Sequence, residues 1–139
     1  MSHSSKDREF VALDIAVLTV SDSRTEETDK SGKLLADRLQ GAGHRLVEKR
    51  FVPDDVYTIR AVVAGWIAAA GVDAVITTGG TGVTGRDGTP EAVAPLLDKT
   101  IDGFGEVFRA ISLEQIGTST IQSRAMAGVA NGTYVFCVP

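Results

Sequence analysis

The chain has 139 residues, of which 43% are hydrophobic and 23% charged, a composition typical of one folded domain and not of a disordered chain. Its 14 basic and 18 acidic residues give a net charge of −4, which argues against a nucleic-acid-binding protein, because neutralising phosphates needs a basic surface. The first ten residues lack the apolar core of a signal peptide, and no apolar run reaches the roughly 20 residues that cross a bilayer. These features predict a cytoplasmic protein that does not bind membranes.

Patterns typical of strands and helices alternate along the chain. Residues 1–10 are expected to form a flexible tail and residues 11–139 a single domain. The run LDIAVLTV (13–20) is apolar on both faces, as in a strand buried between two helical layers. Further strands are predicted over 45–52, 72–78 and 133–138, and helices over 31–42, from Asp54 or Asp55 to 70, from Thr89, and around 104–111. This order predicts an α/β fold, a three-layer α/β/α sandwich with a largely parallel sheet.

The loops that follow the predicted strands are the candidate binding segments, because ligands of such folds bind beyond the carboxyl ends of the strands. They are residues 21–24, 53–55 and 79–89. Ser21 and Asp22 can bond to ligand hydroxyl groups or form a turn, and the sequence does not favour either.

Five of the 15 glycines fall within residues 77–91, TTGGTGVTGRDGTPE. Glycines allow successive backbone N–H groups to converge on an anion. Thr78, Thr81 and Thr84 add hydroxyl groups, and a helix that Thr89 is expected to cap directs its positive end toward the same region. The segment therefore predicts a phosphate-binding loop, and the alternative is a glycine-rich turn kept for its geometry.

Two common nucleotide motifs are excluded by their context. Residues 80–85 spell G-x-G-x-x-G, but they follow the third predicted strand and not the first, and residues 86–88 separate them from the helix. Gly32-Lys33 lacks the earlier glycine of a Walker sequence. The glycine-rich loop is thus not a nicotinamide dinucleotide site, and the segment around Gly32-Lys33 is not a P-loop.

Two aspartates, Asp54 and Asp87, indicate a binding site for a metal ion. Asp87 lies inside the glycine-rich loop, where a bare carboxylate would repel phosphate, and a bridging Mg²⁺ would remove that repulsion. Asp54 follows the second strand and would face the same crevice, so the pair could hold Mg²⁺ around a nucleotide. The alternatives are that Asp54 caps a helix and that Asp87 occupies a turn.

Other polar residues have less specific interpretations. Ser119, Ser123 and Arg124 could donate to a phosphate, but a surface ion pair for Arg124 is an equal alternative. Cys137 lies in an apolar run and is expected to be a buried, inert thiol. With only two histidines beside it, the chain cannot assemble a zinc site.

Several of these segments together resemble the MoaB/MogA family of molybdenum cofactor biosynthesis proteins, and the resemblance extends over residues 11–139. The combination TGGTG with RDxTPEA is specific, and IGTSTIQSRAMAGVAN is closer to the MoaB branch. The matching segments are VLTVSD (17–22), VPDD (52–55), TTGGTGVTGRDGTPEA (77–92), GFGEVFR (103–109) and TSTIQSRAMAGV (118–129).

The resemblance implies a molybdopterin-binding fold and the Mg-ATP-dependent adenylylation of molybdopterin. In that reaction the terminal phosphate of the pterin attacks the α-phosphorus of ATP and pyrophosphate leaves. Asp54 and Asp87 match the family's functional, Mg²⁺-associated acids. The residues that match its phosphate loop are Gly79, Gly80, Thr81 and Gly82, and those that match positions near the ligand are Ser21, Asp22 and Ser123.

The resemblance also implies an assembly and further partners. Relatives form trimers or dimers of trimers, and a downstream molybdenum-insertion protein is an implied partner. In relatives the final strand continues into a turn and a C-terminal helix, whereas this sequence stops at Pro139, so we expect one wall of the pterin site to be absent. The alternative function is a non-catalytic molybdopterin-binding or scaffold protein of the same fold.

Overall fold

The computed structural model describes residues 8–139; residues 1–7 of the predicted tail lie outside the described residues. A six-stranded sheet with strand order β2-β1-β3-β6-β5-β4 forms the middle layer. Strands β1, β2, β3 and β6 run parallel, and β4 and β5 run antiparallel to their neighbours. The strands are β1 (Asp14–Val20), β2 (Arg45–Val52), β3 (Ala74–Thr78), β4 (Lys99–Thr100), β5 (Met126–Ala130) and β6 (Thr133–Val138).

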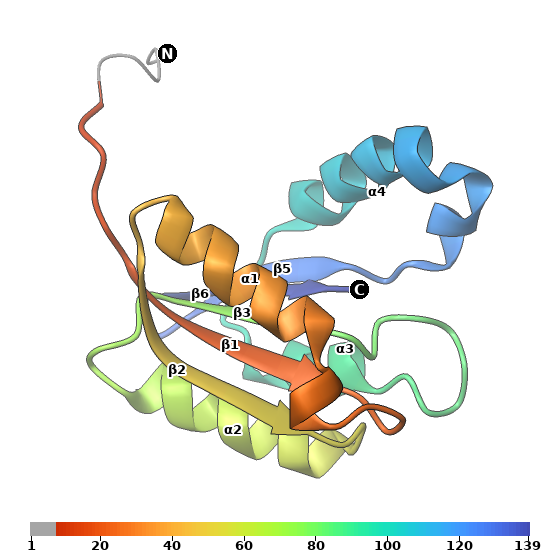
Figure 1. The fold of residues 1–139 in the computed structure, drawn as a ribbon, viewed down its shortest axis with the longest axis horizontal. Coiled ribbons are helices and arrows are strands. Elements are labelled where there is room, and N and C mark those ends of the chain that lie inside the picture. The colour runs from red at the N-terminus through yellow and green to blue at the C-terminus, as the bar shows by residue number, and fades with distance from the viewer. Residues whose placement is uncertain (1–7) are drawn as a thin grey trace.

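Helices cover both faces of this sheet (Figure 1). Helices α2 and α3 lie on one face, and α1 and α4 lie on the other, which confirms the three-layer arrangement. The helices are α1 (Lys30–Gly41), α2 (Val56–Ala68), α3 (Thr89–Val93) and α4 (Asp102–Ile116), with 3₁₀ turns over Glu26–Thr28, Ala94–Leu96 and Gly117–Gln122. Within residues 8–139, no helix combines the length and the apolar character that crossing a bilayer requires.

The larger core lies between the sheet and helices α2 and α3. Leu18 and Val75 from the sheet and Ile59 and Val63 from α2 are completely buried there. Each such side chain stabilises the fold by about 1.5–3 kcal/mol relative to an exposed one. A smaller cluster, which includes Val17, holds α1 on the other face. The burial of β1 on both faces is what its uninterrupted apolar run predicts.

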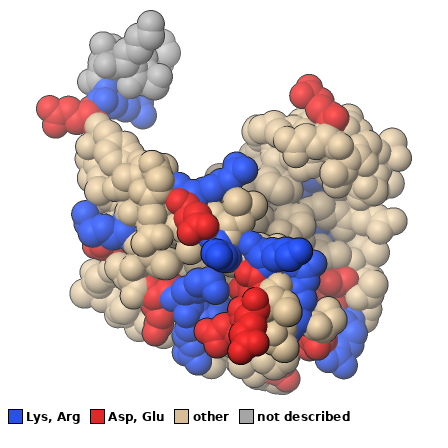
Figure 2. Space-filling view, in the orientation of Figure 1, with Lys and Arg blue, Asp and Glu red and all other residues tan. Residues whose placement is uncertain are grey.

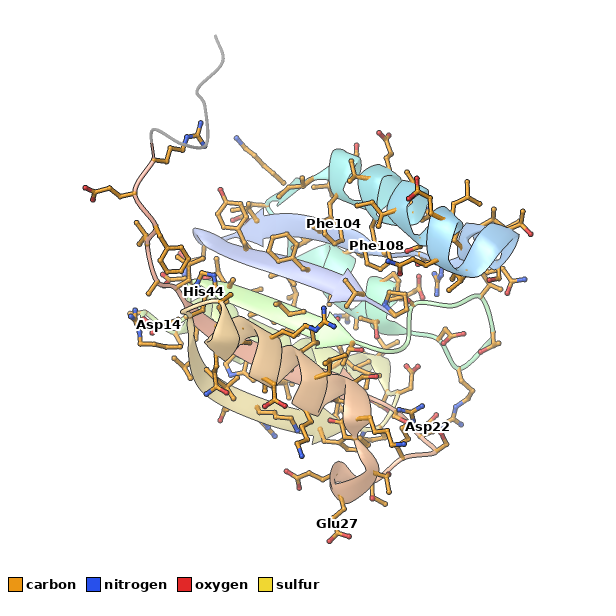
Figure 3. All side chains as sticks on the ribbon, turned by 45° about the horizontal axis from the view of Figure 1, so that its top comes forward. Asp14, Asp22, Glu27, His44, Phe104 and Phe108 are labelled. Atoms are coloured by element: carbon orange, nitrogen blue, oxygen red, sulfur yellow. The ribbon has the colours of Figure 1, made fainter. Side chains whose placement is uncertain are left out.

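Helix α4 is attached less deeply than the others. Gly105 is its one buried residue, and the rings of Phe104 and Phe136 on β6 lie 5.2 Å apart. Figure 2 shows acidic and basic side chains intermingled over the lower part of one face, whereas the surface over α4 carries few charges. In Figure 3, Phe104 and Phe108 point from α4 toward the sheet. The outer side of α4 therefore remains exposed.

The sequence did not predict β5 or the short β4. Strand β5 has the sequence MAGVA, whose alanine and glycine residues have low strand propensity. A Cβ atom at Gly128 would collide with Leu97, so this position needs glycine for close packing and not for a turn. The predicted turn is confirmed: Asn131 and Gly132 have φ angles of 50° and 75° and join β5 to β6 as a hairpin.

Candidate functional site

The carboxyl ends of the four parallel strands meet at one edge of the sheet. Val20 at the end of β1 pairs with Val52 at the end of β2, and Thr78 at the end of β3 pairs with Val138 of β6. The segments 21–24, 53–55 and 79–89 leave the sheet at this edge. The structure therefore brings together the three loops that the sequence singled out.

The base of the glycine-rich loop is fixed by its backbone. Gly79 and Gly80 have φ angles of +99° and +71°, and a Cβ at Gly79 would collide with the carbonyl oxygen of Val20. The Thr89 hydroxyl donates to the Gly79 carbonyl at 2.9 Å, and the Thr89 N–H donates to the Gly80 carbonyl at 3.0 Å. The prediction that Thr89 caps the helix is wrong: Thr89 is the first residue of the five-residue α3, and its hydroxyl closes the loop instead.

Asp87 is held inside this loop. Its Oδ2 accepts hydrogen bonds from the Thr84 N–H at 2.9 Å and the Thr84 hydroxyl at 2.7 Å. The Thr84 hydroxyl is the main cause that lowers the pKa of Asp87, and the backbone N–H groups of Thr84 and Gly82 act in the same direction. Asp87 therefore carries a negative charge at a fixed position.

Asp54 lies on the opposite side of the crevice and is more deeply set. Its Oδ1 accepts from the Gly88 N–H at 3.0 Å, so it touches the loop next to Asp87. Burial is the main cause that raises the pKa of Asp54, and the charges of Asp22 and Asp87 add to it. The helix-cap alternative is wrong for Asp54, because the carboxylate that accepts the Thr58 N–H at the start of α2, at 2.8 Å, belongs to Asp55.

Asp22 joins all three loops (Figure 3). Its Oδ1 accepts the Asp54 N–H at 3.0 Å, and its Oδ2 accepts from Arg86 Nη2 at 2.6 Å and Nε at 3.0 Å. The Ser21 hydroxyl accepts the N–H groups of Ser23 and Arg24 at 3.3 and 3.2 Å, so Ser21 forms the turn that was one of its two alternatives. Arg86 immediately precedes Asp87 in the same loop, but no sequence pattern marks it as a site residue.

Arg124 braces the far side of the glycine-rich loop. Its guanidinium donates to the carbonyl oxygens of Gly82 at 2.7 Å and Asp87 at 2.9 Å and pairs with both carboxylate oxygens of Glu91 at 2.6 and 3.0 Å. Its N–H donates to the Thr81 carbonyl at 2.8 Å. Of the two interpretations of Arg124, a donor to phosphate and a surface ion pair, the structure shows the ion pair, with Glu91. The adjacent Ser123 hydroxyl accepts the N–H of Ala125 at 3.3 Å.

Two hollows open between these loops. One of about 470 Å³, which we call the acidic hollow, is lined by Asp22, Asp54 and Asp55 together with Pro53, Val56, Tyr57, Gly85, Arg86 and Gly88. The other, of about 200 Å³, is lined by the hydroxyl residues Thr19, Ser21, Ser31 and Thr78 and by Val20, Arg24, Asp29, Gly79 and Pro139. The predicted site residues that line neither hollow are Gly80, Thr81, Gly82, Asp87 and Ser123. The crevice thus offers carboxylates, hydroxyls and glycine backbone from segments distant in sequence.

The donor set of the crevice fits Mg²⁺. Among residues 8–139 no three or more His, Cys, Asp or Glu side chains come close enough to enclose a metal ion. Mg²⁺ commonly takes one or two carboxylates and completes its octahedral shell with substrate phosphates and water. Asp54, which accepts the Gly88 N–H, and Asp87, the residue before Gly88, are the carboxylates at this loop that could take part. A site of this kind would form only together with a phosphate ligand.

Cys137 is buried, as expected, and burial raises the pKa of its thiol to about 11. A thiol with that pKa remains protonated at pH 8, and the thiolate is the reactive form. We expect native protein to resist alkylation by iodoacetamide at pH 8 and unfolded protein to take up one group, as measured by intact mass. Rapid labelling of the native chain would contradict this burial.

Comparison with known proteins gives consistent matches over most of the chain. Residues 16–139 match the family model described as "Probable molybdopterin binding domain". Molybdenum cofactor biosynthesis protein B of Escherichia coli (strain K12) is 55% identical over 131 residues, which are 94% of this chain and 77% of that protein. The crystal structure of a Molybdenum cofactor biosynthesis protein B has 47% identity and a TM-score of 0.89, covering 95% of this chain and 83% of that chain. The crystal structure of the tungsten cofactor synthesizing protein MoaB from Pyrococcus furiosus has 42% identity and a TM-score of 0.76 and covers 91% of this chain and 81% of that chain.

Proposed function

The chain belongs to the family of molybdopterin-binding domains found in molybdenum cofactor biosynthesis proteins, and from that premise we propose that it adenylylates molybdopterin with Mg-ATP. The observation that carries the proposal is a pair of carboxylates at the glycine-rich loop: Asp87 is held within the loop by Thr84, and Asp54 accepts the N–H of Gly88. A protein that only bound the pterin would have no need for two acids at a phosphate-binding loop. Transfer of a nucleotidyl group needs charge neutralisation at that position.

The proposed reaction forms a bond between an oxygen of the pterin phosphate and the α-phosphorus of ATP. The bond from that phosphorus to the β-phosphate oxygen breaks, and pyrophosphate leaves with the electron pair. Asp54 and Asp87 would hold Mg²⁺, which supplies positive charge to the phosphate oxygens when it is bound. The phosphate-loop residues are Gly79, Gly80, Thr81 and Gly82, of which Gly80 and Thr81 would donate their N–H groups to the phosphates. The N–H of Gly79 donates to the Val138 carbonyl at 3.0 Å and that of Gly82 bonds to Asp87, so these two glycines would shape the loop. Ser21 and Ser123 are proposed to lie near the substrates.

The fixed geometry of the loop supports this role. Thr89 closes the base of the loop and Arg124 donates to its carbonyl groups, and both contacts restrict movement of the loop backbone. Preorganised N–H groups and charges are what catalysis of phosphoryl-type transfers depends on. The protein would thus act mainly by positioning and charge neutralisation.

A single-turnover assay tests the proposal. The protein is mixed with fresh molybdopterin and Mg-ATP, and the adenylylated pterin and pyrophosphate are measured by chromatography. Formation of both in equal amounts, and only with Mg²⁺, is the expected result. Binding of the pterin without any adduct would instead favour the alternative, a non-catalytic binding or scaffold protein.

We also propose that the chain forms a homo-oligomer, a trimer or a dimer of trimers, through the outer side of α4. Val107 and Ile111 are one helical turn apart on this helix and are 59% and 55% exposed, and Ile116 and Ile121 beyond them are 61% and 79% exposed. An exposed apolar surface of this kind is characteristic of protein interfaces. We further propose that the protein is located in the cytoplasm and that a molybdenum-insertion protein is its partner.

The oligomer is tested by light scattering after size-exclusion chromatography. We expect the unaltered chain to have the mass of a trimer or hexamer. The double variant Val107→Glu/Ile111→Glu should have the mass of a monomer, because closing the interface would bury two charged side chains away from water. Leu34→Glu, at a 52% exposed position of α1, is the matched control and should keep the oligomeric mass. A monomeric mass for the unaltered chain would refute the assembly.

A further inference from the structure

Arg86 is the one basic side chain that lines the acidic hollow within the described residues 8–139. It extends from the tip of the glycine-rich loop, immediately before Asp87, and its side chain is 76% exposed. Three carboxylates line the same hollow, on Asp22, Asp54 and Asp55. A phosphate chain that enters this hollow therefore meets an excess of negative charge with one cation beside it.

In the present structure Arg86 is engaged by Asp22. Both Nη2 and Nε of Arg86 donate to Oδ2 of Asp22, at 2.6 and 3.0 Å. The other oxygen of Asp22 is independently fixed by the N–H of Asp54. Asp22 would thus keep its place if the guanidinium left, and the exposed ion pair contributes little to stability.

The planar guanidinium suits both partners. A carboxylate and a phosphate each accept two parallel N–H bonds from arginine, and phosphate does so with more negative charge. The long, exposed side chain of Arg86 can rotate without moving the loop, since the loop is anchored separately through Thr89 and Arg124. Exchange of one partner for the other needs no change in the fold.

We infer that Arg86 binds the phosphate chain of the nucleotide, and that Asp22 holds Arg86 at the hollow until the nucleotide displaces it. Asp22 is then a competing partner of Arg86, which the phosphates displace, and it makes no contact with the ligand. This inference rests on the proposed use of ATP as substrate. It predicts that Arg86 matters for the phosphates and not for the nucleoside, and that loss of Asp22 does not weaken nucleotide binding.

The inference is tested by calorimetric titration of the full chain with Mg-ATP and with adenosine. Arg86→Ala should weaken Mg-ATP binding by about tenfold to a hundredfold, the usual effect of losing a charge-assisted hydrogen bond, and leave adenosine binding unchanged. Arg86→Lys should recover part of the loss, because it keeps the charge without the planar pair of donors. Arg38→Gln, at an exposed position in the last turn of α1, is the control and should bind like the unaltered chain.

Variants of Asp22 distinguish phosphate binding by Arg86 from a purely structural role of the Arg86–Asp22 ion pair. Asp22→Asn should bind Mg-ATP as tightly as the unaltered chain or more tightly, because Arg86 no longer has a competing partner. The double variant Asp22→Asn/Arg86→Ala should bind no better than Arg86→Ala alone. Weaker Mg-ATP binding by Asp22→Asn, or equal losses for ATP and adenosine in Arg86→Ala, would overturn the inference.

The result also separates the two proposals. If the unaltered chain binds Mg-ATP in the expected pattern but forms no adenylylated pterin, the role of Arg86 stands and the adenylyltransferase is refuted. If adenylylation occurs and Arg86→Ala binds Mg-ATP normally, only the role of Arg86 is refuted. Failure of the unaltered chain to bind Mg-ATP would overturn both.

Discussion

Asp87→Asn is expected to reduce the single-turnover rate of adenylylation at least about a hundredfold, the effect typical of removing one preorganised charge contact from an active site. The substitution removes the negative charge proposed to hold Mg²⁺. The asparagine carbonyl can still accept from the N–H and hydroxyl groups of Thr84, but as a neutral acceptor it forms weaker hydrogen bonds than the carboxylate. A rate within a fewfold of the unaltered chain would remove Asp87 from the mechanism.

The same variant should be less stable. Hydrogen bonding from Thr84 lowers the pKa of Asp87 below its ordinary value of 3.8 in the folded chain. Its contribution to stability is therefore present above pH 3.8 and is lost as the pH falls through the lower, folded pKa. We expect a lower melting temperature for Asp87→Asn at pH 7 in metal-free buffer. Asp37→Asn, which changes an exposed aspartate of α1, is the control for loss of charge alone and should affect neither rate nor stability.

Asp54→Asn is expected to raise the Mg²⁺ concentration for half-maximal adenylylation by about tenfold or more, since one of two proposed carboxylate ligands loses its charge. A magnesium titration of the single-turnover rate measures this. The asparagine carbonyl can still accept the N–H of Gly88, so the loop should keep its position. An unchanged titration would count against Asp54 as a ligand.

The stability of Asp54→Asn should change in the opposite direction from that of Asp87→Asn. Burial raises the pKa of Asp54 above its ordinary value of 3.8, and the charges of Asp22 and Asp87 increase the shift. The stability that goes with its protonated form is complete below pH 3.8 and is lost as the pH rises through the folded pKa. At pH 7 and without metal, Asp54→Asn should therefore melt at the same or a higher temperature. A clear decrease would show that the ionised carboxylate is favourable where it lies.

The two aspartates show how far the sequence could predict the site. Asp54 was selected from its place after a strand and Asp87 from its place in the glycine-rich loop, and the structure places the Asp54 carboxylate on the N–H of Gly88, the residue after Asp87. The sequence could not tell which of Asp54 and Asp55 caps α2, because either is a suitable residue one position apart. Asp55 caps α2 through a local bond to Thr58, whereas Asp54 bonds to Gly88, 34 residues away, a partner that it meets only in the folded chain.

Arg86 and Arg124 show what sequence patterns leave open. Both are arginines near a glycine-rich loop, and their position in the sequence does not indicate whether the guanidinium bonds to the loop itself or to another segment. The tertiary structure places Arg124 against Glu91 and two loop carbonyls and pairs Arg86 with Asp22, 64 residues away in the chain. The partner of a long side chain is decided by contacts of this kind, which local sequence does not encode.

The sequence by itself determined the parallel part of the fold and the position of the crevice. Apolar runs that lack alternation can be buried only between two helical layers, and the loops after parallel strands must meet at one edge. The antiparallel β5, with its alanine and glycine residues, and the role of the Thr89 hydroxyl were decided by tertiary structure alone. The physical reason is that periodicity and propensity report local preferences, whereas strand pairing, burial and the partners of polar groups depend on segments that meet only in the folded chain.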